Sequence, residues 1–244
     1  MEGKNYIIIM LIVISHLTVE ASNRENILQA YISGDMSQWK EIIDRMEQQK
    51  RGSPAFILEL LNYQYGYIGY SLGSGKRDEA RKYLDLANEN LSKVMDAGYR
   101  PALAHAYRSA LYGFEIGLRR IKAPILGPRS VDNARRAMEL DGSEPLGYIH
   151  YGNTQYYLPA IFGGSKYTAL EYYRKAEELF ERDPEAARKN WVYLNLLVVM
   201  AMAYEELGYY EMAKDYYEKG LEAAPDFSWV KDELYPRLLR ENFP

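Results

Sequence analysis

The sequence has no cysteine and only three histidines, so it lacks most of the residues that build covalent or metal-based active sites. Without thiols, the chain cannot form disulfide bonds, thiolate nucleophiles, thiolate metal sites or a lipid attachment through an N-terminal cysteine. An excess of positive charge is also missing, since 30 lysines and arginines stand against 34 aspartates and glutamates. Because a nucleic-acid surface needs a basic excess, this balance argues against a nucleic-acid partner.

Long hydrophobic runs are lacking after the first residues of the chain. Residues 1–21 have a basic start at Lys4, an apolar run over 6–17 and a small-x-small ending at Ala21, which is typical of a secretory signal peptide. We therefore predict a periplasmic or secreted protein with a cleavable signal peptide, whose mature chain does not span a membrane. The alternative is a retained membrane anchor, although the 15 uncharged residues between Lys4 and Glu20 fall short of the roughly 20 that a spanning helix needs.

The most regular stretch is Leu194–Phe227, which is 34 residues long. Counted from Leu194, its marked positions are Ala201 at 8, Tyr204 at 11, Gly208 at 15, Tyr210 at 17, Ala213 at 20, Tyr217 at 24, Gly220 at 27 and Pro225 at 32. Small residues let two helices touch, aromatic rings fill the space beside them, and glycine and proline end the helices. This spacing resembles a tetratricopeptide repeat (TPR), a helical hairpin with the same period.

The rest of the chain shows the same pattern in weaker form. Helical periodicity predicts helices over 54–72, 78–97, 100–122, 130–140, 145–162, within 188–222 and over 226–240. The small residues equivalent to Ala213 are Ala80, Ser130 and Ala169, so the repeats are lengthened and unequal. We predict an all-α, TPR-like helical-hairpin solenoid with degenerate, lengthened repeats. Its parts are N-terminal capping helices over 22–51 with Ser37 as an N-cap, about four hairpins over 52–225, and a C-terminal capping helix over 226–244.

Tyrosine is unusually abundant, with 24 copies against 6 phenylalanines and 3 tryptophans. One interpretation is that the rings pack between helices and leave their hydroxyl groups at the edge of the core. The other is that they line an aromatic groove for a ligand or peptide. Composition leaves both open.

The third repeat departs from the pattern, because about five extra residues are inserted around Leu158-Pro159-Ala160. The stretch Leu126–Phe180, with its LGP and NTQYYLPAIFGGS segments, resembles secreted bacterial TPR proteins and is similar to the TPR component associated with TRAP-type solute transporters. That resemblance implies assembly with a solute-binding protein and a ligand route through a central hole lined by the first helix of each hairpin. By position, it places Tyr156, Pro159, Phe162, Gly163 and Gly164 near the hole.

Residues with catalytic chemistry are sparse and scattered. His105 and His150 lie on different predicted helices without a carboxylate partner in sequence, so we interpret them as packing or surface residues. The pairs Glu177-Glu178 and Glu205-Glu206 are adjacent on helices, where neighbouring side chains do not face each other. No nucleophile elbow, zinc-binding helix motif or dinucleotide fingerprint occurs. We predict no enzyme activity, no cofactor and no metal site.

The inner face of the regular repeat predicts what it binds. Its groove positions hold Asn195, Val198, Met202, Glu205 and Glu206, which offer apolar side chains and two acids rather than the basic set that would clamp a peptide carboxylate. The first four of these residues, with Tyr156, Tyr157, Pro159 and Phe162 of the insertion, form the predicted binding site. We predict a non-catalytic adaptor whose partner is another protein. The alternative is a carrier of a small apolar ligand, which requires the insertion to close over a tyrosine-lined pocket.

Overall fold

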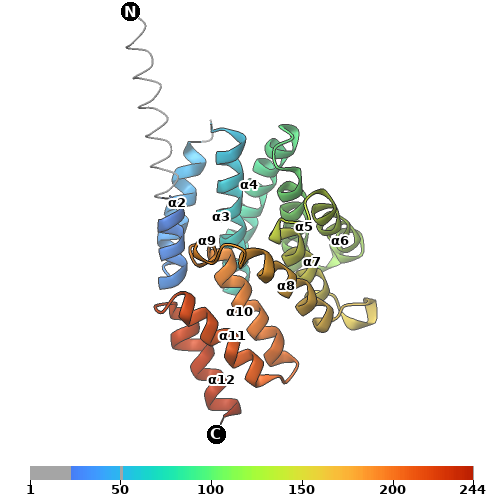
Figure 1. The fold of residues 1–244 in the computed structure, drawn as a ribbon. Helices are drawn as coiled ribbons and strands as arrows, with labels where there is room; N and C mark the ends of the chain where they lie inside the picture. Colours follow the sequence, from blue (N-terminus) through green and yellow to red (C-terminus); the bar gives the residue numbers. More distant parts are fainter. Residues whose placement is uncertain (1–22, 50–51, 244) are drawn as a thin grey trace, which may run out of the picture.

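The computed structural model describes residues 23–49 and 52–243 (Figure 1), and within them the chain is helical with no β-strand. The helices pack as successive antiparallel hairpins, which confirms the predicted all-α, TPR-like architecture. The predicted signal peptide over 1–21 lies outside the described residues. Within these residues, no helix combines the length and the hydropathy needed to cross a bilayer.

Two short helices precede the hairpins. Residues 23–33 form the first helix, and α2 (Met36–Gln48) follows after a turn at Gly34. The Asp35 carboxylate caps α2 by accepting from the backbone N–H groups of Ser37 at 3.1 Å and Gln38 at 3.0 Å. The predicted cap at Ser37 was therefore wrong by two residues, because the aspartate reaches the free N–H groups of the first turn.

Four hairpins form the body of the molecule. Their paired helices are α3 (Pro54–Gly73) with α4 (Arg77–Asp96), α5 (Pro101–Leu118) with α6 (Ala123–Leu140), α7 (Pro145–Tyr157) with α8 (Lys166–Phe180), and α10 (Trp191–Glu206) with α11 (Tyr210–Ala223). Short elements stand between them, namely η1 (Arg120–Lys122), η2 (Ala160–Phe162) and α9 (Pro184–Arg188). Gly208 follows α10 with a φ of 78°, so the predicted glycine stop is confirmed.

Two helix boundaries differ from prediction because of proline. We predicted that the segment 123–128 ends the fifth helix and that its partner begins at Ser130, but α6 already begins at Ala123. Pro124 falls in the first turn, where its missing N–H breaks no hydrogen bond. The predicted helix 145–162 instead stops at Tyr157, ahead of the extended Leu158 that precedes Pro159.

The predicted single C-terminal capping helix is two elements. A π-helical segment, η3 (Trp229–Leu234), leads into α12 (Tyr235–Asn242). Pro236 has no N–H to continue an α-helical ladder from the preceding turn, so the hydrogen-bond register changes just before it. The apolar spacing predicts that Trp229, Leu234, Leu238 and Leu239 face the core. Leu234 and Leu238 do so, but Trp229 is 37% exposed and Val230 beside it is buried instead.

Aromatic packing brings the two ends of the array together. The Trp39 and Trp191 rings lie 5.1 Å apart, and the Tyr31 ring lies 5.7 Å from Trp191 and 5.0 Å from Phe227. The N-terminal helices therefore pack against the last hairpin as well as the first, where we had expected them to cover one end of a stack. Tyr83, Tyr107, Tyr173 and Tyr217 are fully buried, which confirms the packing role for these tyrosines.

Candidate functional site

The α7–α8 loop carries the most exposed aromatic residues of the predicted site. Tyr157 and Phe162 are 75% and 72% exposed, and Ile161 beside them is 86% exposed. In Figure 1 the loop projects outward as the yellow segment beyond α7 and α8. Such large apolar side chains held in solvent are typical of a contact surface for a partner or ligand.

Backbone hydrogen bonds hold this loop in one conformation. The Phe162 and Gly164 N–H groups both donate to the Pro159 carbonyl, at 2.8 Å and 3.3 Å, and the Ser165 N–H donates to the Gln155 carbonyl at 3.0 Å. A Cβ at Gly164 would lie 1.7 Å from the Leu158 carbonyl oxygen, so the turn requires glycine there. A partner would meet a loop backbone that is already held by hydrogen bonds, which lowers the entropic cost of binding.

Tyr156 ties the base of the loop to α10. Its hydroxyl donates to the Glu206 carboxylate, and the Lys166 ammonium pairs with the same carboxylate at 2.5 Å. Burial is the largest cause that raises the pKa of Tyr156, and the hydrogen bond and charge of Glu206 raise it further, so the phenol stays protonated. Burial also raises the pKa of Glu206, but the hydrogen bonds from Lys166 and Tyr156 outweigh it, so this carboxyl titrates below its usual range. Tyr156 is thus a support for the loop rather than part of its exposed tip.

The four predicted residues of α10 do not join the loop in one exposed surface. Val198 is 1% exposed, so the prediction that it lines an open groove was wrong. Asn195 accepts a hydrogen bond from the Tyr31 hydroxyl at 3.0 Å, and Met202 is half-buried against the core. Glu205 accepts from the hydroxyl of Tyr217 and pairs with Arg237 of α12 at 2.9 Å. Residues of the terminal helices contact α10 at Asn195 and Glu205. Of the eight predicted site residues, the exposed ones are Tyr157, Pro159 and Phe162, and all three lie on the loop.

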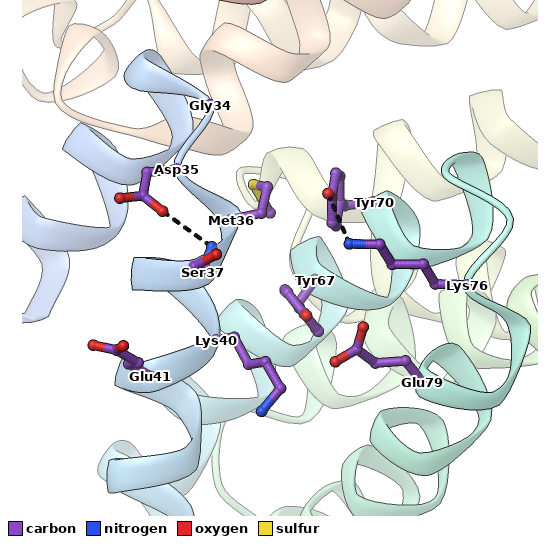
Figure 2. A pocket seen from close by; sticks show the side chains of 10 residues that line it. All are labelled: Gly34, Asp35, Met36, Ser37, Lys40, Glu41, Tyr67, Tyr70, Lys76 and Glu79. Carbon is purple, nitrogen blue, oxygen red and sulfur yellow. Dashed lines mark hydrogen bonds between the residues drawn. The ribbon is translucent and has the colours of Figure 1, made fainter.

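A pocket of about 430 Å³ opens elsewhere, between α2, α3 and α4 (Figure 2). The two lysines that line it already have partners: the Lys76 ammonium donates to the Tyr70 hydroxyl at 3.1 Å, and Lys40 pairs with Asp44 at 2.5 Å. Tyr67 and Glu79 complete the wall facing α2. This pocket is polar and takes no residue from the third hairpin, so it is not the tyrosine-lined pocket that the carrier hypothesis requires.

The histidines and acidic pairs are placed as structural residues. The His105 ring pairs with the Asn133 side chain at 2.8 Å. His150 is 1% exposed beside Tyr65, and burial lowers its pKa to about 3. Glu177 and Glu178 pair with Lys219 and Lys175 respectively. Across the described ranges, no group of three histidine or carboxylate side chains is arranged to hold a metal ion.

Sequence reasoning missed Ile161, which is more exposed than either predicted aromatic residue, and Tyr167, which is 57% exposed at the start of α8. It also missed the hydrogen bond between Tyr156 and Glu206. A signal for Ile161 was present, because it stands in the inserted segment between a proline and two glycines, where no helical core position exists. The link from Tyr156 to α10 spans 50 positions and left no local signal.

Comparison with known proteins supports the repeat assignment. Residues 194–227 match the sequence pattern described as "Tetratricopeptide repeat". The chain carries a TPR. No curated protein matches it in sequence.

Solved structures share the fold of this chain at low identity. A thermophilic TPR protein from Thermus thermophilus aligns with a TM-score of 0.56 and 17% identity, over 91% of this chain and 99% of its own. The HusA haemophore from Porphyromonas gingivalis aligns with a TM-score of 0.52 and 18% identity, over 66% of this chain and 80% of its own. At these identities the likeness concerns the fold alone.

Proposed function

We propose that this protein is a non-catalytic adaptor that binds another protein through the α7–α8 loop. The observation that carries the proposal is the set of exposed apolar side chains, Tyr157, Ile161 and Phe162, held on a hydrogen-bonded loop. TPR arrays present helical surfaces to partner proteins, and large apolar or aromatic side chains are the usual anchors of an interface. The buried inner face of α10 makes the loop a better docking site than the groove.

The proposal includes the cellular setting that the sequence predicts. We propose an exported protein, periplasmic or secreted, that works within an envelope or solute-transport system. The resemblance of Leu126–Phe180 to transporter-associated TPR proteins supports this setting and suggests a solute-binding protein as partner. A partner of that kind would meet the loop with an apolar surface, because residues 157–165 contain no charged side chain.

Site-specific photo-crosslinking tests the adaptor proposal. A photoreactive phenylalanine at position 161 should crosslink one defined protein in the native host, whereas the same residue at Leu140 should not. Leu140 is a suitable control because it is also exposed but is the last residue of α6, outside the α7–α8 loop. Equal crosslinking at both positions, or none at 161, would overturn the proposal.

Truncation of the loop aromatics gives a quantitative prediction. Tyr157→Ala and Phe162→Ala should each weaken partner binding about tenfold or more, as expected for interface anchors. Because both side chains are exposed, the free energy of unfolding should change by less than about 0.5 kcal/mol, as measured by thermal unfolding with circular dichroism. Tyr173→Ala, which empties a fully buried site, is the matched control and should lower stability by about 3–5 kcal/mol. A comparable loss of stability in the loop variants would show that they are core residues.

The second candidate is a carrier of a small apolar ligand. The observation that favours it is that two exposed aromatic rings, Tyr157 and Phe162, stand on one short loop where they can stack on a flat molecule. The structurally similar HusA protein is described as a haemophore, so haem is a sensible probe. Native mass spectrometry separates the two functions, since a carrier gains a small-molecule mass and an adaptor gains a protein mass. Saturable haem binding that Tyr157→Ala abolishes would favour the carrier.

A further inference from the structure

The tip of the second hairpin exposes aliphatic side chains that the fold does not use. We define this tip as residues 119–129, which cover η1 and the first turns of α6. Ile121 is 88% exposed and Ile125 is 62% exposed, and Pro124 and Pro128 beside them are also exposed. β-Branched aliphatic residues at such exposure lose favourable burial free energy unless something covers them.

The packing of α6 explains why these side chains face outward. Leu126 and Ser130 are buried, and the Ser130 hydroxyl donates to the Ser109 carbonyl of α5 at 2.8 Å. Ile125 and Arg129 are four residues apart on α6, so they lie on one stripe about 100° around the helix from Leu126 and Ser130, and Ile121 lies in η1 just before this helix. The tip is also anchored to the first hairpin, because Arg77 donates to the Leu118 carbonyl at 2.5 Å.

The charge of the tip is uniformly basic. Arg119, Arg120 and Arg129 are exposed, and within the described residues their guanidinium groups make no ion pair or hydrogen bond. Lys122 is the exception because it pairs with Glu115. Residues 119–129 contain no acidic side chain, although the whole chain has a formal charge of −4. The three arginines therefore form a local positive field around the isoleucines.

Other arginines of the same helix behave differently. Arg135 pairs with Asp132 at 3.5 Å and Arg136 pairs with Glu139 at 3.1 Å. The α7–α8 loop also exposes apolar side chains, but it lacks a free cation, because Lys166 at its end is paired with Glu206. Within these two hairpins, the tip alone combines exposed aliphatic side chains with unpaired arginines.

We propose that the hairpin-2 tip docks on the surface of an anionic lipid bilayer. Ile121 and Ile125 insert at the level of the headgroups, and Arg119, Arg120 and Arg129 bind lipid phosphates. Arginine matches phosphate geometry and basic residues near a membrane surface are attracted by its negative potential. Apolar side chains between basic ones are the combination that holds a protein in the membrane interface without spanning it. This inference does not rest on the proposed protein partner.

Vesicle flotation of the purified chain, as its own cell processes it, tests the proposal. Binding should be strong to phosphatidylcholine vesicles that contain about a quarter phosphatidylglycerol, weak to pure phosphatidylcholine, and largely lost near 1 M salt, where charges are screened within about 3 Å. Equal binding to both vesicle types, or none to the anionic ones, would overturn the proposal. No protein partner is present, so the outcome is separate from the crosslinking result.

Paired variants locate the contact. Ile121→Ser/Ile125→Ser and Arg119→Gln/Arg120→Gln should each lower the partition onto anionic vesicles about tenfold. The matched controls, Leu140→Ser and Arg135→Gln/Arg136→Gln, should bind as the unchanged protein does. Circular dichroism should show the same melting curve for the tip variants, because their side chains are exposed. Tip variants that bind normally, or controls that lose as much binding, would assign the contact to another part of the chain, or to a protein-binding role for the tip.

Discussion

His150 is a buried polar side chain that the core leaves unsatisfied. Its ring lies 5.1 Å from the Tyr65 ring and 6.4 Å from the Tyr107 ring, and within the described residues neither ring nitrogen has a hydrogen-bond partner. An unpaired buried donor or acceptor costs about 1–3 kcal/mol. Burial lowers the pKa of the imidazole to about 3, so the folded protein keeps this ring neutral.

This burial makes stability depend on pH below the ordinary histidine range. The unfolded chain takes up a proton near pH 6.5, whereas the folded protein does so only near pH 3, so stability falls as the pH drops between these values. Each pH unit in that window should cost about 1.4 kcal/mol. His150→Leu should reduce the loss seen by thermal unfolding between pH 6.5 and pH 5. An unchanged pH dependence in the variant would show that other groups cause it.

At the scale of single elements, helix α3 approaches its neighbours through a glycine. A Cβ at Gly66 would lie 2.6 Å from a Trp39 ring atom and 2.8 Å from a Trp191 ring atom. The missing side chain therefore lets the indole rings of α2 and α10 pack directly on the α3 backbone. The Trp39 indole N–H donates to the Tyr63 carbonyl of α3 at 3.0 Å, and the Trp191 N–H donates to the Asn62 side chain at 2.9 Å.

Glycine-to-alanine changes should separate the effect of this contact on stability from the effect of helix propensity. Gly66→Ala should destabilise the protein by about 1–3 kcal/mol, because the new methyl group overpacks two rigid rings. Gly113→Ala in α5 is the control, since nothing lies within 4 Å of its would-be Cβ, and it should be neutral or stabilising by up to about 1 kcal/mol. Chemical denaturation measures both, and equal effects would contradict the packing explanation.

At the scale of the whole molecule, the array is closed by contacts between its ends. In an open solenoid each repeat contacts only its neighbours, so the terminal repeats can unfold separately. Here Tyr31 packs against Trp191 and Phe227, and its hydroxyl reaches Asn195, which is 164 positions away. The first helix and the last hairpin therefore stabilise each other across the array.

Because the two ends contact each other, a destabilising substitution at one end should also destabilise the other. Tyr31→Ala should lower the free energy of unfolding by about 3 kcal/mol and raise amide hydrogen exchange in α10 and η3 as well as in α2. Tyr99→Ala is the control, because Tyr99 is 37% exposed at a turn between hairpins, and its effect should stay small and local. Faster exchange confined to residues 23–48 in the first variant would indicate that the ends unfold independently.

Local patterns in the sequence were sufficient for the class of fold and for most helices. Helical periodicity, the small residues at Ala201, Ala213 and Gly220, and the stop at Gly208 act between residues a few positions apart, so they can be recognised without a structure. The departure of residues 158–165 from the repeat was also visible, and it is the segment that projects. Helix ends near Pro124, Pro159 and Pro236 were harder, because the effect of a proline depends on its place in the turn.

Tertiary structure alone decided which of these faces is free. The repeat position of Val198 is the same whether that side of α10 meets water or another part of the protein, so Val198 was assigned to a groove, but it is 1% exposed. The exposure of Ile121 likewise depends on the absence of a neighbour, which no short sequence window records. Burial results from contacts between residues far apart in the chain, whereas helix formation results from residues within a few turns of one another.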